Sequence, residues 1–459
     1  YGVRKGASFF YLLLVCCAFV LSGCVQGPLS ISKKPINFIE SYKAPACDSE
    51  NYLQNELKKA KDGSDSIYLS INAAAVARNC ENFKLSNEFL DLAEESYKFD
   101  VDLEGTGTKV GRHLVGILLN DTFADYDGNL YERIMVNVYK GLNFMSLKDY
   151  ENARVEFNRA LLRQDKAKDY FAAQIQATKA ELEKAKKEDE HYSENIKNTE
   201  MIQEEYSQLF AEFKTSENFT NPYATYLASV FFYLDKDYTN AADKFREISI
   251  ANPKIKPFQN IRKTLETKAR KVKDDKKRYI FLAYEDGFGT IKEEFSLSIP
   301  YVFSNEAVPL KLALPTLKKR EASYGVVSIN GTVARQVSNF DNIFATEFKT
   351  ELPGIITKTV LSTAAKTAIT AIVAKNAGGV AGLITGLVAV ATNQADIRVW
   401  QTLPKTASIA MVANKGTYSI TDATGFEIAK GEVTKGKDVL IWVRSVDKQS
   451  APKIIIMEN

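Results

Sequence analysis

The cysteine thiols are the side chains whose positions most clearly predict chemistry. Cys24 ends the run Leu21-Ser22-Gly23-Cys24, which follows Arg4, Lys5 and an uncharged apolar stretch over residues 9–20. A basic start, an apolar stretch and small residues at a cleavage point are typical of a secretory signal peptide. A cysteine at that point is typical of a lipobox, in which the thiol takes a diacylglycerol thioether and the amine freed by cleavage can also be acylated. We therefore expect lipid on Cys24, and two or more acyl chains give stable anchoring.

This interpretation also predicts where the protein lies. The apolar stretch is shorter than the roughly 20 residues that a membrane-spanning helix needs, so a cleaved signal peptide over residues 1–23 fits better than a permanent span. The mature protein is then expected on the periplasmic side of a bacterial membrane. Val25, in the position where Asp would favour the inner membrane, indicates the outer membrane. The alternative is an ordinary signal peptide with an incidental cysteine.

Two other thiols remain after processing. Cys16 and Cys17 leave with the signal peptide, so Cys47 and Cys80 are the pair that an oxidising compartment could join. Closing a loop of this length would stabilise the fold by about 3 to 4 kcal/mol on a chain-entropy estimate. Two separate buried thiols are the alternative, and the sequence does not decide between them.

Catalytic and cofactor motifs are not recognisable in the sequence. His113 and His191 have no Cys, Asp or Glu at a metal-ligand spacing, and there is no Gly-x-Ser-x-Gly, P-loop or dinucleotide fingerprint. We predict no catalytic residue, no metal and no cofactor, hence no enzyme. The formal charge of +3 falls to +1 without residues 1–23, which gives no indication of nucleic-acid binding.

The pattern of the remaining chain predicts an α+β protein of several domains. Residues 24–46 contain three prolines and no periodicity, and we expect a lipidated tether there. Apolar residues at helical spacing predict an all-α domain over residues 47–276. Alternating strand patterns predict a β-rich, sandwich-like domain over residues 277–459, with a helical insertion at about 341–395.

The helical domain contains a repeat with tetratricopeptide (TPR) spacing. Small and aromatic residues recur at positions that let two antiparallel helices approach closely. The stronger copies use Gly141, Phe144, Ala153, Phe157 and Ala160, and Ser229, Phe232, Ala241 and Phe245 with Pro253 as the helix stop; a weaker copy uses Ala74, Ala77, Phe83, Ser86, Leu90 and Ala93. We expect an irregular array of TPR-like helix pairs.

The insertion is rich in Ala and Gly. Gly378, Gly382 and Gly386 stand four residues apart in an uncharged stretch, which predicts close contact between two helices. We expect a helical hairpin that packs internally or mediates self-association, with membrane insertion as the alternative.

Asp396, Arg398 and Trp400 alternate along the chain just after this insertion. The alternation places them on one face of a strand or extended turn. Two interpretations remain open: a binding site, or a buried Asp396–Arg398 ion pair beside a packed Trp400.

The chain resembles a family of proteobacterial TPR lipoproteins over nearly its whole length. The resemblance lies in Tyr131-Glu-Arg133, in the Ala-Gly-rich segment 377–391 and above all in 394–404, Gln-Ala-Asp-Ile-Arg-Val-Trp-Gln-Thr-Leu-Pro. The family has no established activity to carry over. Its members are often encoded beside lipoproteins that activate cell-wall synthases, which implies a place in envelope assembly.

These predictions together favour a non-catalytic envelope scaffold. We expect it to bind envelope proteins through a groove of the TPR-like repeats and to contact the membrane through its lipid. A structural subunit of an oligomeric envelope machine is the first alternative. A cell-wall hydrolase is a weaker one, because it would need a nucleophile or metal set.

Overall fold

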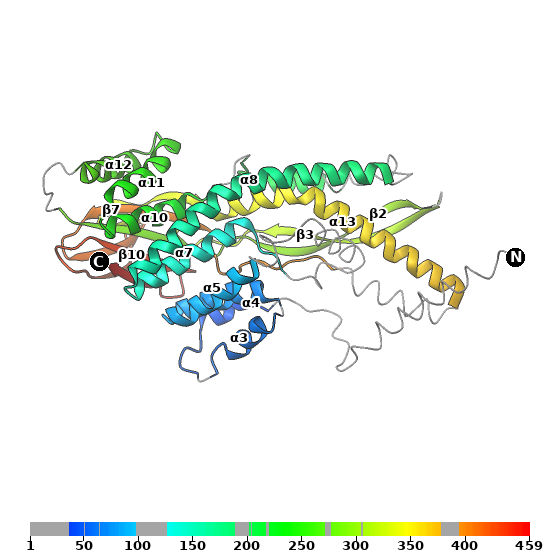
Figure 1. The fold of residues 1–459 in the computed structure, drawn as a ribbon, viewed down its shortest axis with the longest axis horizontal. Coiled ribbons are helices and arrows are strands. Elements are labelled where there is room, and N and C mark those ends of the chain that lie inside the picture. Colours follow the sequence, from blue (N-terminus) through cyan, green and yellow to red (C-terminus); the bar gives the residue numbers. More distant parts are fainter. Residues whose placement is uncertain are drawn as a thin grey trace.

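The structure is a computed structural model of the chain, shown in Figure 1. It describes residues 36–49, 51–63, 65–97, 126–188, 202, 204–216, 220–270, 277–303, 306–377 and 394–459. A helical region precedes β-sheets and one further long helix, so the α+β class is confirmed.

The helical region consists mainly of antiparallel pairs. Its described helices are α2 (Phe38–Lys43), α3 (Gln54–Lys61), α4 (Ser66–Asn79), α5 (Phe83–Tyr97), α7 (Leu130–Ser146), α8 (Tyr150–Glu188), α10 (Pro222–Leu234), α11 (Tyr238–Ala251) and α12 (Lys256–Ala269). Helices α4, α7 and α10 each pack against the helix that follows them. The first helices of these pairs are apolar around most of their circumference and are buried almost throughout.

The turns within the three pairs α4–α5, α7–α8 and α10–α11 have one geometry. Glu81, Lys148 and Lys236 take the left-handed conformation with φ of 58°, 61° and 62°. The next residue donates its N–H to the carbonyl five residues back, which is the Schellman pattern at a helix end: Asn82 to Ala77, Asp149 to Phe144 and Asp237 to Phe232. The side chain of that same residue then accepts the N–H three positions on and caps the second helix.

The strands form two sheets and a separate hairpin. The strands are β1 (Tyr279–Asp286), β2 (Ile291–Phe303), β3 (Glu306–Lys318), β4 (Val327–Ile329), β5 (Thr332–Val333), β6 (Arg335–Asn339), β7 (Thr406–Ala413), β8 (Thr417–Asp422), β9 (Glu427–Glu432), β10 (Val439–Ser445) and β11 (Lys453–Glu458). The five-stranded sheet has the order β11-β10-β1-β7-β6, the four-stranded sheet has β5-β4-β8-β9, and β2 pairs with β3. In the centre, β1 runs parallel to β10 and antiparallel to β7.

The five-stranded sheet lies between two apolar layers. Side chains alternate along β1, so Phe281 and Ala283 join the core formed by the helices, while Ile280, Leu282 and Tyr284 join a second core shared with the four-stranded sheet. The core formed by the helices is one connected cluster of buried side chains, with members from Phe38 to Met457. Helices and strands therefore meet near residue 277 in the sequence but share one core in space.

Two parts differ from the sequence-based expectation in detail. The last part of the expected tether, residues 36–46, contains helix α2, whose Phe38 and Tyr42 are buried in the helical core. The first part of the insertion is helix α13 (Phe340–Ala377), which packs along α8 and β3 (Figure 1). Residues 378–393, with Gly378, Gly382 and Gly386, lie outside the described residues. No helix in the described ranges is long and apolar enough to cross a membrane.

Candidate functional site

The predicted lipobox lies outside the part of the chain that the structure describes. This applies to Leu21, Ser22, Gly23 and Cys24, and equally to His113 and His191. Among the described residues there is no group of three or more His, Cys, Asp or Glu that could hold a metal ion.

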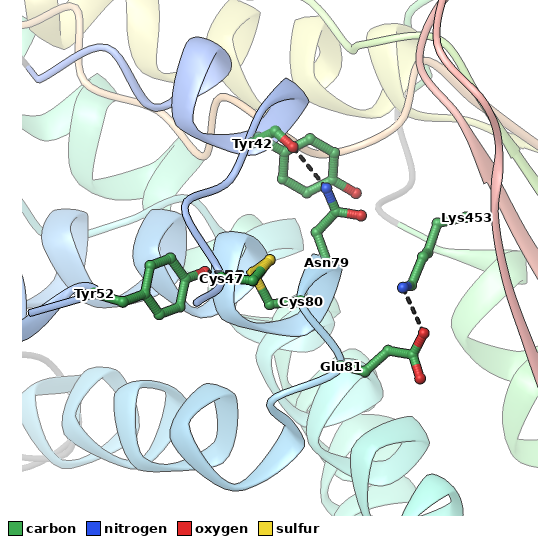
Figure 2. The surroundings of a disulfide bond; sticks show 7 residues. All are labelled: Tyr42, Cys47, Tyr52, Asn79, Cys80, Glu81 and Lys453. Atoms are coloured by element: carbon green, nitrogen blue, oxygen red, sulfur yellow. Dashed lines mark hydrogen bonds and ion pairs between the residues drawn. A yellow bond between two sulfur atoms is a disulfide. The ribbon is translucent and has the colours of Figure 1, made fainter. Parts of the chain in front are cut away.

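Cys47 and Cys80 form a disulfide, which is one of the two alternatives that the sequence left open. Figure 2 shows that the bond joins the segment after α2 to the end of α4. The Tyr52 hydroxyl lies 3.2 Å from Sγ of Cys80, and the Asn79 amide donates to the carbonyl of Tyr42 at 2.6 Å. The disulfide and this hydrogen bond together fasten α2 to the body of the protein.

The residues predicted to pack in the repeat lie between the helices of each pair. Ala74, Gly141 and Ser229 are buried in the first helices, facing Ser86, Ala153 and Ala241 in the second. A Cβ atom on Gly141 would lie 2.8 Å from the ring of Phe157, so the glycine is required by close approach. In the pairs α4–α5 and α10–α11 a serine hydroxyl joins the two helices. Ser86 donates to the Ala74 carbonyl, and Ser229 donates to the Ala241 carbonyl. Phe144 is half-buried, Phe232, Phe245 and Ala160 are buried, and the exposed Pro253 follows the end of α11.

Asp396 and Arg398 form a bidentate ion pair. Nε and Nη2 of Arg398 each donate to one oxygen of Asp396 at 2.9 Å, and Nη1 donates to Asp65 at 2.8 Å. Burial opposes the charge on Asp396, but the Arg398 guanidinium lowers the pKa of that carboxyl. The arrangement matches the ion-pair interpretation of this motif rather than an open binding site.

Trp400 is buried, and its backbone N–H contacts the side chain of Glu132. The Trp400 N–H donates to Oε1 of Glu132 at 2.7 Å, while Oε2 of Glu132 accepts the Tyr126 hydroxyl and the Asn129 N–H. Residues 131–133 and 394–404 are thus in contact through one fully buried carboxylate, that of Glu132. They join helix α7 to the irregular segment that leads into β7.

A second buried carboxylate, Glu285 on β1, organises what we call the helix–sheet junction. Its oxygens accept hydrogen bonds from Tyr139 on α7 at 3.0 Å, Tyr223 on α10 at 2.8 Å and Trp442 on β10 at 2.8 Å. Nε of Arg444 lies 3.7 Å from the same carboxylate. One acidic side chain therefore connects two helices and two strands.

A small cavity lies beside this junction. Its volume is about 20 Å³, close to the space that one water molecule needs. Its lining includes Tyr42, Arg78, Trp400 and Trp442, together with Glu285 and Arg444. Arg78 is buried, and its guanidinium lies over the Trp442 ring with 4.5 Å from Cζ to the ring centroid.

A third charged cluster lies within the helical region itself. Lys140 on α7 is buried and pairs with Glu94 at 2.7 Å, Glu156 at 3.2 Å and Asp91 at 2.7 Å. Burial opposes the charge on Glu94, but Lys140 and Arg163 lower its pKa to about 2. The cluster joins α5, α7 and α8.

The sequence did not single out Arg78, Glu285 or Arg444, and it indicated Glu132 only as part of the segment 131–133. A signal for Glu285 and Arg444 exists, because each is a charged residue inside a run of strand-forming apolar residues. Such a residue is buried only when it has partners, and these partners come from distant helices that periodicity does not reveal.

The buried carboxylates connect elements that are distant in the sequence. Glu132 and Glu285 accept hydrogen bonds from donors on different elements. Buried polar groups with several partners fix the elements that supply those partners relative to one another. Comparisons of the chain with protein-family models, with curated proteins and with solved structures found no match.

Proposed function

We propose that this protein is a lipid-anchored envelope protein that acts as a non-catalytic scaffold or adaptor for other proteins. The observation that carries the proposal is the equivalence of the three helix pairs. They share the left-handed turn residue, the Schellman bond, the side-chain cap and the small residues at the contact. Repeated helix pairs of this kind build extended surfaces for protein partners.

The finer fold assignment belongs to the same proposal. We regard the three pairs as degenerate TPR-like units. The second helix of the middle pair, α8, is longer than a TPR helix and makes the array irregular. We regard the two facing sheets as a sandwich-like unit, since β1, β7 and β10 share a core with β4 and β8.

The position of the sheet bears on where a partner binds. The inner helices α4, α7 and α10 would line a TPR groove, but here they are buried, and Tyr139, Tyr223 and Tyr226 hydrogen-bond to β1. The chain's own sheet thus fills the face that the sequence suggested for a partner. We therefore propose that partners bind the outer helices, which are the second helices of the pairs: α5, α8 and α11.

Helix α8 has two exposed aliphatic side chains on its outer side. Val155 is 43% exposed and Leu162 is 54% exposed, and seven residues bring both side chains to the same side of the helix. Solvent-exposed aliphatic side chains at this spacing suit a helix or strand of another protein.

Photocrosslinking in living cells tests the scaffold proposal. A photoreactive amino acid at Leu162 is expected to capture a discrete envelope protein. The control position is Lys430 on β9, whose side chain is 74% exposed. Equal patterns from both positions, or capture from neither, would contradict the proposal.

A separate experiment tests the anchor. Cys24→Ser is expected to abolish incorporation of labelled palmitate and to leave unprocessed or wrongly cleaved protein, because the thiol carries the first lipid. Undiminished palmitate labelling of the variant would overturn the assignment of the anchor to Cys24. The crosslinking experiment tests the scaffold surface separately.

The second candidate is a structural subunit of an oligomeric envelope machine, with self-association through residues 341–395. The specific observation behind it is the arm formed by α13, α8 and the β2–β3 hairpin, which extends away from the sheets (Figure 1). Light scattering of the purified protein separates the two: a monomer favours the adaptor, and a closed oligomer favours the subunit.

A further inference from the structure

The cavity at the helix–sheet junction contains a guanidinium that the fold does not satisfy. Nη1 of Arg78 donates to Oδ1 of Asn143, but Nε and Nη2 have no hydrogen-bond partner among the described residues. Arg78 is only 4% exposed, and it lines the cavity. A buried donor without a partner is costly, and the cost is larger for a charged group.

The two unpartnered atoms form one side of the guanidinium. In arginine the Nε–H and one Nη2–H bond point in nearly the same direction, as a two-pronged donor. A single negatively charged atom can accept from both N–H bonds at once, and charge-assisted hydrogen bonds of this kind are stronger than neutral ones. The geometry of the unused edge therefore suits an anion better than a neutral acceptor.

The charges around the cavity also do not balance. Arg78 and Arg444 contribute two positive charges, whereas Glu285 is the one carboxylate among the residues that line it. Glu285 is already occupied by Tyr139, Tyr223 and Trp442, and Arg444 donates to the carbonyls of Thr402 and Ser445. Both arginines interact with Glu285, so one positive charge remains without a counter-charge among the residues that line the cavity. Burial lowers the pKa of Arg78 from its usual value, and a bound anion would oppose that effect.

We propose that this cavity binds a small monovalent inorganic anion of the chloride type, held by Nε and Nη2 of Arg78. The size argues for a single atom, because about 20 Å³ holds roughly one water-sized guest and leaves no room for a carboxylate or phosphate group. The Trp442 ring covers one face of the guanidinium, so the anion lies in the plane of the donors. The ion acts as a structural counter-charge between α4 and the five-stranded sheet.

The first experiment compares anions at equal ionic strength. Urea unfolding of the full-length purified protein is followed in sodium chloride and in sodium gluconate, whose anion is too large for the cavity. The expected result is a higher unfolding midpoint in chloride, with an increment that saturates as chloride is raised, because a ligand of the folded state stabilises by mass action. Identical midpoints in the two salts would overturn the proposal and assign the cavity to water only.

The second experiment uses the tryptophans as local reporters. The chain has two, Trp400 and Trp442, and both line the cavity. Bromide is expected to quench part of their emission in a saturable way, and chloride is expected to reverse that part by competition. Quenching that is purely linear and insensitive to chloride would contradict a site.

Matched variants identify the residue responsible. Arg78→Met is expected to lose the chloride-specific increment, while the exposed Arg335→Met retains it. If Arg78→Met does not fold, Arg78→Lys decides: it keeps the charge but loses the paired donors, and we expect about tenfold weaker chloride affinity. An unchanged affinity in Arg78→Lys would remove Arg78 from the site.

Discussion

At the scale of single residues, buried carboxylates connect elements that are far apart in sequence. Glu132 links α7 to the segment before β7, and Glu285 links two helices to two strands. A third, Glu347 on α13, accepts the N–H groups of Leu130 at 2.5 Å and Tyr131 at 3.4 Å. It therefore caps the first turn of α7 from another element, where the helix dipole favours a negative group.

Glu347 makes stability depend on pH. Its burial, followed by repulsion from Glu351, raises the pKa of the Glu347 carboxyl well above 4.5. Between the ordinary and the raised pKa the folded protein holds more protons than the unfolded chain, so stability falls as pH rises through that window.

Glu347→Gln is expected to remove this fall, because the amide oxygen still accepts the Leu130 N–H without a charge. Above the window the variant should be more stable than the parent. Urea unfolding at a series of pH values measures this, with the exposed Glu432→Gln as control. If Glu347→Gln follows the parent's pH profile, the buried carboxylate is not its source.

The sequence predicted some of these residues and missed others for a physical reason. Asp396, Arg398 and Trp400 were visible because they alternate, and an ion pair with a packed Trp400 was one of two interpretations. The roles of Glu132, Glu285 and Arg78 were not predicted, because they depend on hydrogen-bond donors and aromatic rings that come from distant elements. Local spacing carries no information on such partners.

At the scale of elements, the repeated turn explains the helical region. A left-handed, non-glycine residue at the end of each first helix is followed by an Asn or Asp that caps the second, which reverses the chain within three residues. The small residues Gly141 and Ala153 then allow the two helices to approach until Phe157 fills the space beside them. The helix pairs could be read from the sequence because both the small residues and the caps recur.

Ala153→Leu tests this close contact. Ala153 is fully buried on α8, so the larger side chain has no space and should lower the free energy of unfolding by about 1 to 3 kcal/mol. Val155→Leu, on the exposed side of the same helix, serves as the matched control and should leave stability within about 0.5 kcal/mol. Equal urea midpoints for Ala153→Leu and the parent would show that the helices do not touch there.

The sequence predicted a β-rich region here but not the long β2–β3 hairpin itself. Thirteen residues of each strand pair in register, yet the segment contains Pro300, Pro309 and Pro315. Proline within a strand argues against a central position, and among the described residues these two strands pair only with each other. By contrast, Asn330-Gly331 predicts a tight turn, and both residues have positive φ between β4 and β5.

At the scale of the whole molecule, the helices cover one face of the five-stranded sheet that follows them in the sequence. Periodicity predicted separate helical and β-rich domains, since it reports only local structure. The structure has a core from Phe38 to Met457 that the helices share with one face of the five-stranded sheet, and a second core between the two sheets. The helix–sheet junction and the disulfide both belong to the part that contains the first core. The second helices of the pairs are the surface that we propose for partners.

Two-probe equilibrium unfolding tests this central claim most directly. Tryptophan emission reports the junction, because Trp400 and Trp442 are the two tryptophans of the chain and both are buried there, while far-ultraviolet circular dichroism reports mainly the helices. If the helices and the five-stranded sheet fold as one unit through their shared core, the two signals should have the same urea midpoint and the same slope. Helical signal that persists after the tryptophan transition is complete would mean that the helical region folds without the sheet, and the account of a shared helix–sheet core would be wrong.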